Sequence, residues 1–139
     1  MTFPGVIDIH WSVMAPAITL LVTAAVTLFF ALSARDSRGA AAVAIIGLVT
    51  ASVFTVAQLL AGEPTASSFG LRYLGDVPAL ALTIVILLGT AIAVLVSWDQ
   101  LGRGAMEHPE YYPLMLLAAL GAVIMASAGD LITLILGLE

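Results

Sequence analysis

The side chain most suited to chemistry is Glu139, because it follows an uncharged apolar run in a strongly hydrophobic sequence. Asp130 lies nine residues earlier, and a helix over this segment would separate the two carboxylates by about 13.5 Å along its axis. The hydrocarbon core of a bilayer is roughly 30 Å thick. If Asp130 marks a water interface, Glu139 lies near the middle of the membrane, where an ionisable side chain is costly and usually functional.

Two other groups of titratable residues are weaker candidates. Asp8 and His10 could begin a metal or proton site, but two ligands without a third nearby favour a solvated terminus. Glu107, His108 and Glu110 could bind a metal or take up protons. The proline before the last of them breaks the helical geometry that would place them on one face, which favours an ordinary solvated loop. We therefore expect no metal site in this chain.

Composition indicates a helical integral membrane protein. Hydrophobic residues make up 62% and charged residues 9% of the 139 positions, against about 45–50% and 25% in soluble domains. The apolar stretches are continuous, whereas strands of a membrane barrel alternate apolar and polar positions. The absence of cysteine excludes disulfides and thiolate metal sites. A net charge of −5 argues against nucleic acid as a partner, and without a glycine-rich phosphate loop or cysteine we expect no cofactor in this chain.

Apolar runs predict one all-α membrane domain over residues 1–139. Pro16 is placed near the start of the first span, where a helix tolerates proline best. A signal peptide is the competing interpretation of that span, but the segment before it lacks Lys and Arg, so we expect the helix to be retained. Trp11 and Trp98 occupy positions typical of interfacial aromatic residues. The predicted elements are four spans at about 12–32, 40–61, 78–97 and 112–128, and the start of a fifth helix at 131–139.

The four arginines predict the orientation of these spans. Arg35, Arg38 and Arg103 fall in the loops 33–39 and 98–110, and Arg72 falls in the loop 62–77 on the opposite side. The positive-inside rule places the first two loops in the cytoplasm and the N-terminus outside.

A stripe of small residues in the fourth span suggests close helix packing. Ala118, Ala122 and Ala126 recur every four residues, a small-xxx-small pattern suited to contact with a neighbouring helix.

The C-terminal part of the sequence resembles subunit N of NADH-quinone oxidoreductase, respiratory complex I. The residues that carry this resemblance are Glu110-Tyr111-Tyr112, the run LLAALG from Leu116 to Gly121, Ala126-Ser127-Ala128 with Leu131, and the run LGLE from Leu136 to Glu139. Gly75-Asp76 before the third span also resembles the family, while residues 1–70 add little beyond topology. The resemblance is specific over about residues 110–139.

The resemblance implies a membrane-arm subunit of a proton-pumping enzyme, in a bacterial inner membrane, with other membrane subunits as partners. In that family the fifth helix carries a membrane-embedded glutamate used in proton translocation, and Glu139 matches that position. A carboxyl group in hydrocarbon favours its neutral form, and an approaching cation favours the charged form. Such a side chain could therefore take up and release a proton. The family's N-terminus is outside, in agreement with the arginine distribution.

Two departures from the family bear on function. Chains of the family continue through further helices with buried lysines that pair with the glutamate, and this sequence contains no lysine. We therefore expect an N-terminal portion of a longer subunit that is inactive alone. Two alternatives stay open at this stage: a subunit of a related cation/proton antiporter or membrane-bound hydrogenase, and a non-catalytic membrane scaffold.

Overall fold

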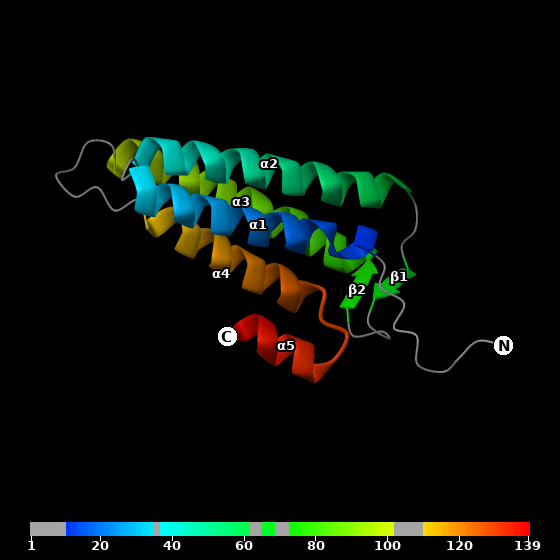
Figure 1. The fold of residues 1–139 in the computed structure, drawn as a ribbon. Coiled ribbons are helices and arrows are strands. Elements are labelled where there is room, and N and C mark those ends of the chain that lie inside the picture. Colours follow the sequence, from blue (N-terminus) through cyan, green and yellow to red (C-terminus); the bar gives the residue numbers. More distant parts are fainter. Residues whose placement is uncertain (1–10, 35–36, 62–64, 69–72, 102–109) are drawn as a thin grey trace.

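Five helices and two short strands make up the computed structural model, which describes residues 11–34, 37–61, 65–68, 73–101 and 110–139. The predicted helical class is confirmed. Figure 1 shows the elements in chain order: α1 (Trp11–Ala34), α2 (Ser37–Ala61), β1 (Thr65–Ser68), β2 (Tyr73–Asp76), α3 (Val77–Leu101), α4 (Tyr111–Ala126) and α5 (Leu131–Leu138).

Three of the helices are long and apolar enough to cross a membrane. Their apolar segments are Met14–Ser33, Arg38–Ala61 and Val77–Trp98. The fourth helix, α4, is a shorter apolar helix of 16 residues, which rises about 24 Å. Length and composition therefore identify three candidate spans, whereas the sequence predicted four and the start of a fifth.

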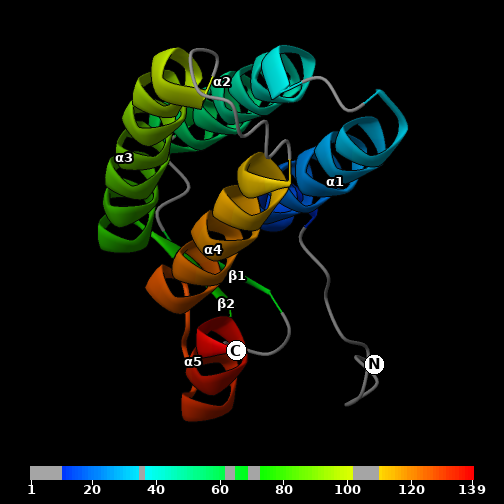
Figure 2. The same ribbon diagram turned by 90° about the vertical axis from the view of Figure 1, so that its left-hand side faces the viewer.

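The first four helices form an antiparallel bundle. Helix α1 packs against α2 and α4, and α3 packs against the same two helices from the other side. Figure 2 views the bundle from one end and shows α5 below α4, outside the four-helix arrangement. The ends of α1 and α3 and the starts of α2 and α4 consequently lie at one end of the bundle, and β1, β2 and the α4–α5 turn lie at the other (Figure 1).

Small side chains bring α1 and α2 close together. The α2 contribution to the core consists mainly of alanines, among them Ala40, Ala44 and Ala51, each fully buried. At Gly47 an added Cβ would overlap the side chain of Thr23 on α1. Only a residue without a side chain fits at this point of the α1–α2 contact.

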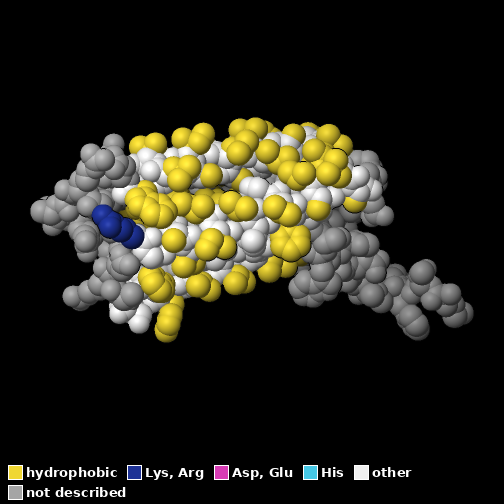
Figure 3. All heavy atoms as spheres, turned by 90° about the horizontal axis from the view of Figure 1, so that it is seen from above, with side chains coloured by type: hydrophobic (Ala, Val, Ile, Leu, Met, Phe, Trp, Pro, Cys, Tyr) yellow, Lys and Arg dark blue, Asp and Glu magenta, His cyan; other side chains and the backbone are white. Residues whose placement is uncertain are grey.

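The outward surface of the bundle is apolar. Figure 3 shows hydrophobic side chains covering the visible face of the bundle between its ends. Phe29 is 76% exposed and Leu60 is 81% exposed. Extensive exposed apolar surface on a water-soluble monomer is rare, whereas hydrocarbon solvates such side chains without cost.

Threonine hydroxyls inside the helices bond to their own helix. Thr19, Thr23 and Thr27 on α1 each donate to the carbonyl oxygen four residues earlier, at 2.6–2.7 Å. Thr55 on α2 and Thr83 on α3, both buried, do the same at 2.9 and 2.8 Å. Among the described residues, no buried side-chain nitrogen or oxygen lacks a partner.

Two expectations about the elements before α3 differ from the structure. Pro16 was predicted near the helix start, but α1 begins at Trp11, so the proline lies in the second turn. There it removes one backbone hydrogen bond, which the first turn would not have required. The connection 62–77 was predicted as loop, and it contains an antiparallel ladder in which Thr65 pairs with Asp76 and Ser68 with Tyr73.

Candidate functional site

The candidate site is the helical hairpin formed by α4, α5 and the turn between them. Helix α4 ends at Ser127, whose backbone N–H donates to the Val123 carbonyl at 3.1 Å. Asp130 then begins α5, and its carboxylate accepts a hydrogen bond from the backbone N–H of Leu131 at 2.7 Å. A carboxylate at this position satisfies a backbone donor and interacts favourably with the helix dipole.

Two glycines bring α5 against α4. An added Cβ on Gly121 would lie 2.6 Å from the carbonyl oxygen of Gly137, and one on Gly137 would lie 2.9 Å from that of Gly121. Gly137 is the buried residue of α5. The α4–α5 contact is therefore backbone against backbone, and a side chain at either glycine would force the helices apart.

This contact sets the depth of Glu139. Helix α5 runs back along α4 (Figure 1), and Glu139 follows Gly137 by two residues, or about 3 Å. Gly121 lies about 15 Å from the Tyr111 end of α4 and about 7.5 Å from its Ala126 end. Glu139 is consequently level with the middle of α4, and its depth in a membrane stays a prediction.

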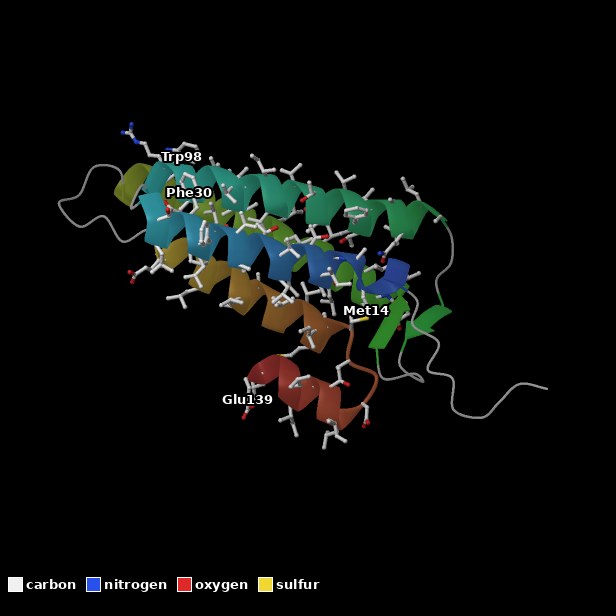
Figure 4. The ribbon with its side chains drawn as sticks, in the orientation of Figure 1. Met14, Phe30, Trp98 and Glu139 are labelled. Atoms are coloured by element: carbon white, nitrogen blue, oxygen red, sulfur yellow. The ribbon has the colours of Figure 1, made fainter. Side chains whose placement is uncertain are left out.

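Glu139 lies at the free end of α5. Its backbone N–H donates to the Ile135 carbonyl at 3.2 Å, so helical hydrogen bonding continues to this residue. Its side chain is exposed, and Figure 4 shows it at the end of α5 rather than between the two helices. The neighbouring outward side chains are apolar: Leu136 is 67% and Leu138 71% exposed. The carboxylate therefore lies on an apolar helical surface, at the level of mid-α4.

Comparisons with known proteins match the whole chain to one kind of protein. No protein-family model matches the sequence. A protein of a Geobacillus species named NADH-quinone oxidoreductase subunit N is 32% identical over 100% of this chain. The protein of that name from Brevibacillus brevis is also 32% identical over 100% of the chain. A third, from Azorhizobium caulinodans, is 42% identical over 69% of it.

The chain is homologous to NADH-quinone oxidoreductase subunit N. The resemblance predicted from the sequence is thereby confirmed. The chain spans only 29% of the length of the Geobacillus subunit N, 28% of that from Brevibacillus brevis and 20% of that from Azorhizobium caulinodans.

Two of the sequence runs that carried the resemblance to subunit N meet at the α4–α5 contact. The run LLAALG ends in Gly121 and the run LGLE contains Gly137. Sequence reasoning selected the alanines of α4 for close packing instead, and Ala118 is exposed while Ala122 and Ala126 are half-buried. A glycine inside each of two consecutive apolar segments was the signal available for the contact.

The weaker candidate residues do not form a site among the described residues. Asp8, His10, Glu107 and His108 lie outside those residues. Glu110 is exposed at the start of α4 and its side chain makes no capping hydrogen bond. Within the part of the chain that the structure describes, no three His, Cys, Asp or Glu side chains come together as metal ligands.

Proposed function

We propose that this chain is part of the membrane arm of a proton-pumping NADH-quinone oxidoreductase in a bacterial inner membrane, with Glu139 as a proton carrier. The relatives are named as subunits of that enzyme, which favours it over an antiporter or a hydrogenase. Other membrane subunits of the complex are the partners that this assignment implies.

The observation that supports the role of Glu139 is its position on the α4–α5 hairpin. The Gly121–Gly137 contact places the carboxylate level with mid-α4, about 10 Å or more from either end of that helix. An uncompensated charge at that depth is costly, and a cation brought close would offset that cost. A partner charge that approaches and withdraws would load and unload a proton at this side chain. The sequence given contains no lysine, and we propose that the cation is a basic side chain outside residues 1–139.

The test is proton pumping by the complete complex carrying Glu139→Gln. Glutamine keeps the size and polarity of the side chain but has no carboxyl group that can bind and release a proton. In inverted membrane vesicles, we expect most of the NADH-driven acidification to be lost while the assembled complex remains detectable by its NADH dehydrogenase activity. Pumping at the parental rate would refute the proposed role.

A matched control is Glu110→Gln. It makes the same chemical change on an exposed side chain at the start of α4, whereas Glu139 is level with the middle of that helix. We expect the control to pump at nearly the parental rate. An equal loss in both variants would attribute the effect to charge removal in general rather than to the depth of Glu139.

We further propose that α1 to α4 cross the membrane, that α5 begins a fifth crossing, and that the N-terminus is outside. The test uses single-cysteine variants, since the chain has no cysteine of its own. A membrane-impermeant maleimide should label Ser67→Cys on intact spheroplasts and Ser37→Cys only after permeabilisation. The opposite labelling pattern would reverse the orientation.

A further inference from the structure

A groove runs along the outer face of the bundle between α2 and α3. It has a volume of about 600 Å³ and is lined by one face of α2 from Ile45 to Leu60 and by Leu88, Ala91 and Leu95 of α3. Ser52 contributes the one hydroxyl in the lining, and that hydroxyl donates to the Leu48 carbonyl at 2.8 Å. The wall therefore offers apolar contact and no free hydrogen-bonding group, which suits a hydrocarbon chain.

Beyond the groove, each of the two helix faces that line it carries a side chain with a polar group. Both side chains lie at the end of the bundle where α2 begins and α3 ends. Arg38 precedes Ile45 by seven residues, close to two helical turns, so it lies on the same face of α2 about 10.5 Å beyond the groove. Trp98 follows Leu95 by three residues, on the same face of α3 and about 4.5 Å beyond.

The surroundings of these two side chains are those of a membrane interface. Arg38 is exposed and Trp98 is 37% exposed. Figure 4 shows Trp98 at the end of the bundle where α2 begins, and Figure 3 shows basic side-chain atoms at one end of the apolar surface. An indole ring at headgroup level with a guanidinium just beyond it matches the order of layers in a bilayer, from hydrocarbon to phosphate.

We propose that the α2–α3 groove binds the acyl chain of an anionic phospholipid whose phosphate is held by Arg38 and Trp98. The groove removes one acyl chain from the bulk lipid and aligns it with the helices. The guanidinium has five N–H donors, so it can bind a phosphate while keeping contacts within the protein. The indole N–H supplies a further donor. An anionic headgroup is preferred because a zwitterionic one brings its own cation to the phosphate.

The proposal can be tested by quenching of Trp98 fluorescence with brominated lipids. Because the sequence contains two tryptophans, the full chain is first given the change Trp11→Phe, so that all emission comes from Trp98. The protein is reconstituted into vesicles of phosphatidylcholine, and dibrominated phosphatidylglycerol or dibrominated phosphatidylcholine is added at equal mole fraction. One basic side chain near an anionic membrane surface contributes about 1 kcal/mol of binding free energy, which is about a fivefold preference for the anionic lipid. We therefore expect Trp98 to be quenched by phosphatidylglycerol as if this lipid were about fivefold enriched around it.

Substitutions separate the headgroup contact from the groove. In Arg38→Gln, the two lipids should quench equally, while Arg38→Lys should keep the preference because the charge remains. Val49→Phe adds bulk to a groove-lining side chain that is 56% exposed and should lower quenching by both lipids. The matched control is Val85→Phe, the same change at a 66% exposed valine of α3 that is not part of the groove lining.

The outcomes decide the proposal as follows. The proposal is supported if phosphatidylglycerol quenches Trp98 preferentially, if Arg38→Gln loses this preference, and if Arg38→Lys and Val85→Phe keep it. Equal quenching by the two lipids in the unsubstituted background overturns it, and so does an unchanged preference in Arg38→Gln. Absence of quenching by either lipid also overturns it, because a protein segment would then cover the groove. Circular dichroism of each variant verifies that helicity is retained.

Discussion

The two close helix contacts of this molecule are built differently. At the α1–α2 contact, Gly47 faces the side chain of Thr23, and both helices contribute buried residues to the core of the bundle. At the α4–α5 contact, Gly121 and Gly137 face each other's backbone, and the other side of α5 is exposed. A side chain can be truncated by mutation to make room, whereas a backbone carbonyl moves only with its helix. A second substitution can therefore relieve the first contact, and the second contact determines where α5 and Glu139 lie.

The largest effect is expected from Gly137→Ala. The new methyl group would lie 2.8 Å from the Met125 side chain and 2.9 Å from the Gly121 carbonyl oxygen. Because backbone atoms form part of this boundary, α5 must move away from α4, and overpacking of this kind costs about 1–3 kcal/mol. Hydrogen exchange in detergent micelles should show faster exchange of the α5 amides and unchanged exchange in α1 and α2. Unchanged exchange in α5 would refute the backbone contact.

A loss of similar size, but one that a second substitution can relieve, is expected from Gly47→Ala. Its methyl group would overlap the Thr23 side chain, including the Thr23 Cβ, which rotation of that side chain does not move. The expected loss of unfolding free energy is about 1–3 kcal/mol.

Removal of the opposing side chain tests this interpretation of Gly47. The double variant Thr23→Ala, Gly47→Ala should recover much of the stability lost in Gly47→Ala, as measured by unfolding of the purified protein in mixed detergent. Additive losses of the two single changes would show that the residues do not oppose each other. No comparable rescue by a neighbouring side chain is expected for Gly137→Ala.

Loss of the helix caps should affect the two regions differently. Asp130→Ala removes the carboxylate that accepts from Leu131, and Asp76→Ala removes the one that accepts from the Ala79 amide at 3.2 Å at the start of α3. Each change costs about 1 kcal/mol. Helix α5 has eight residues and α3 has 25, so local hydrogen exchange should increase throughout α5 but only in the first turn of α3. If the increase in hydrogen exchange were confined to the first turn in both helices, this expectation would be contradicted.

The smallest effect, and one of opposite sign, is expected from Gly89→Ala. An added Cβ at this position of α3 meets no atom within 4 Å. Alanine should therefore raise the unfolding free energy by about 0.5–1 kcal/mol through its greater helix preference. A thermal unfolding curve in detergent checks the sign. If Gly89→Ala destabilised the protein as much as Gly47→Ala, the loss of stability in both variants would come from replacing a glycine and not from the Gly47–Thr23 contact.

The features predicted from the sequence are those with a long-range pattern. Continuous apolar runs identified the helices. The spacing of Asp130 and Glu139 predicted a position of the glutamate near the middle of the membrane, which stays a prediction. Contacts between helices could not be predicted from such patterns. The alanine stripe pointed to Ala118, which is exposed, because alanine is common in apolar helices and carries little information about which face meets a neighbour.

Short and local features were also missed for physical reasons. The strand Thr65–Ser68 consists of small and hydroxyl residues with little strand signal, and its pairing depends on the end of α2 and the start of α3 being held near each other. The start of α1 was predicted to within one residue, since the expected span begins at about 12 and the helix at Trp11. Pro16 lies beyond the first turn with either start, so its position was misjudged by counting and not by the sequence pattern.

The threonine hydroxyls have a consequence for the order in which this protein is assembled. Each of those described in α1 bonds to a carbonyl of the same helix, and so do those of Thr55, Thr83 and Thr90. The threonine hydroxyls of such a helix already have hydrogen-bond acceptors when the helix enters hydrocarbon. Insertion of each segment by the translocation machinery can therefore precede its association with neighbours, and the glycine contacts can form afterwards by lateral encounter within the bilayer.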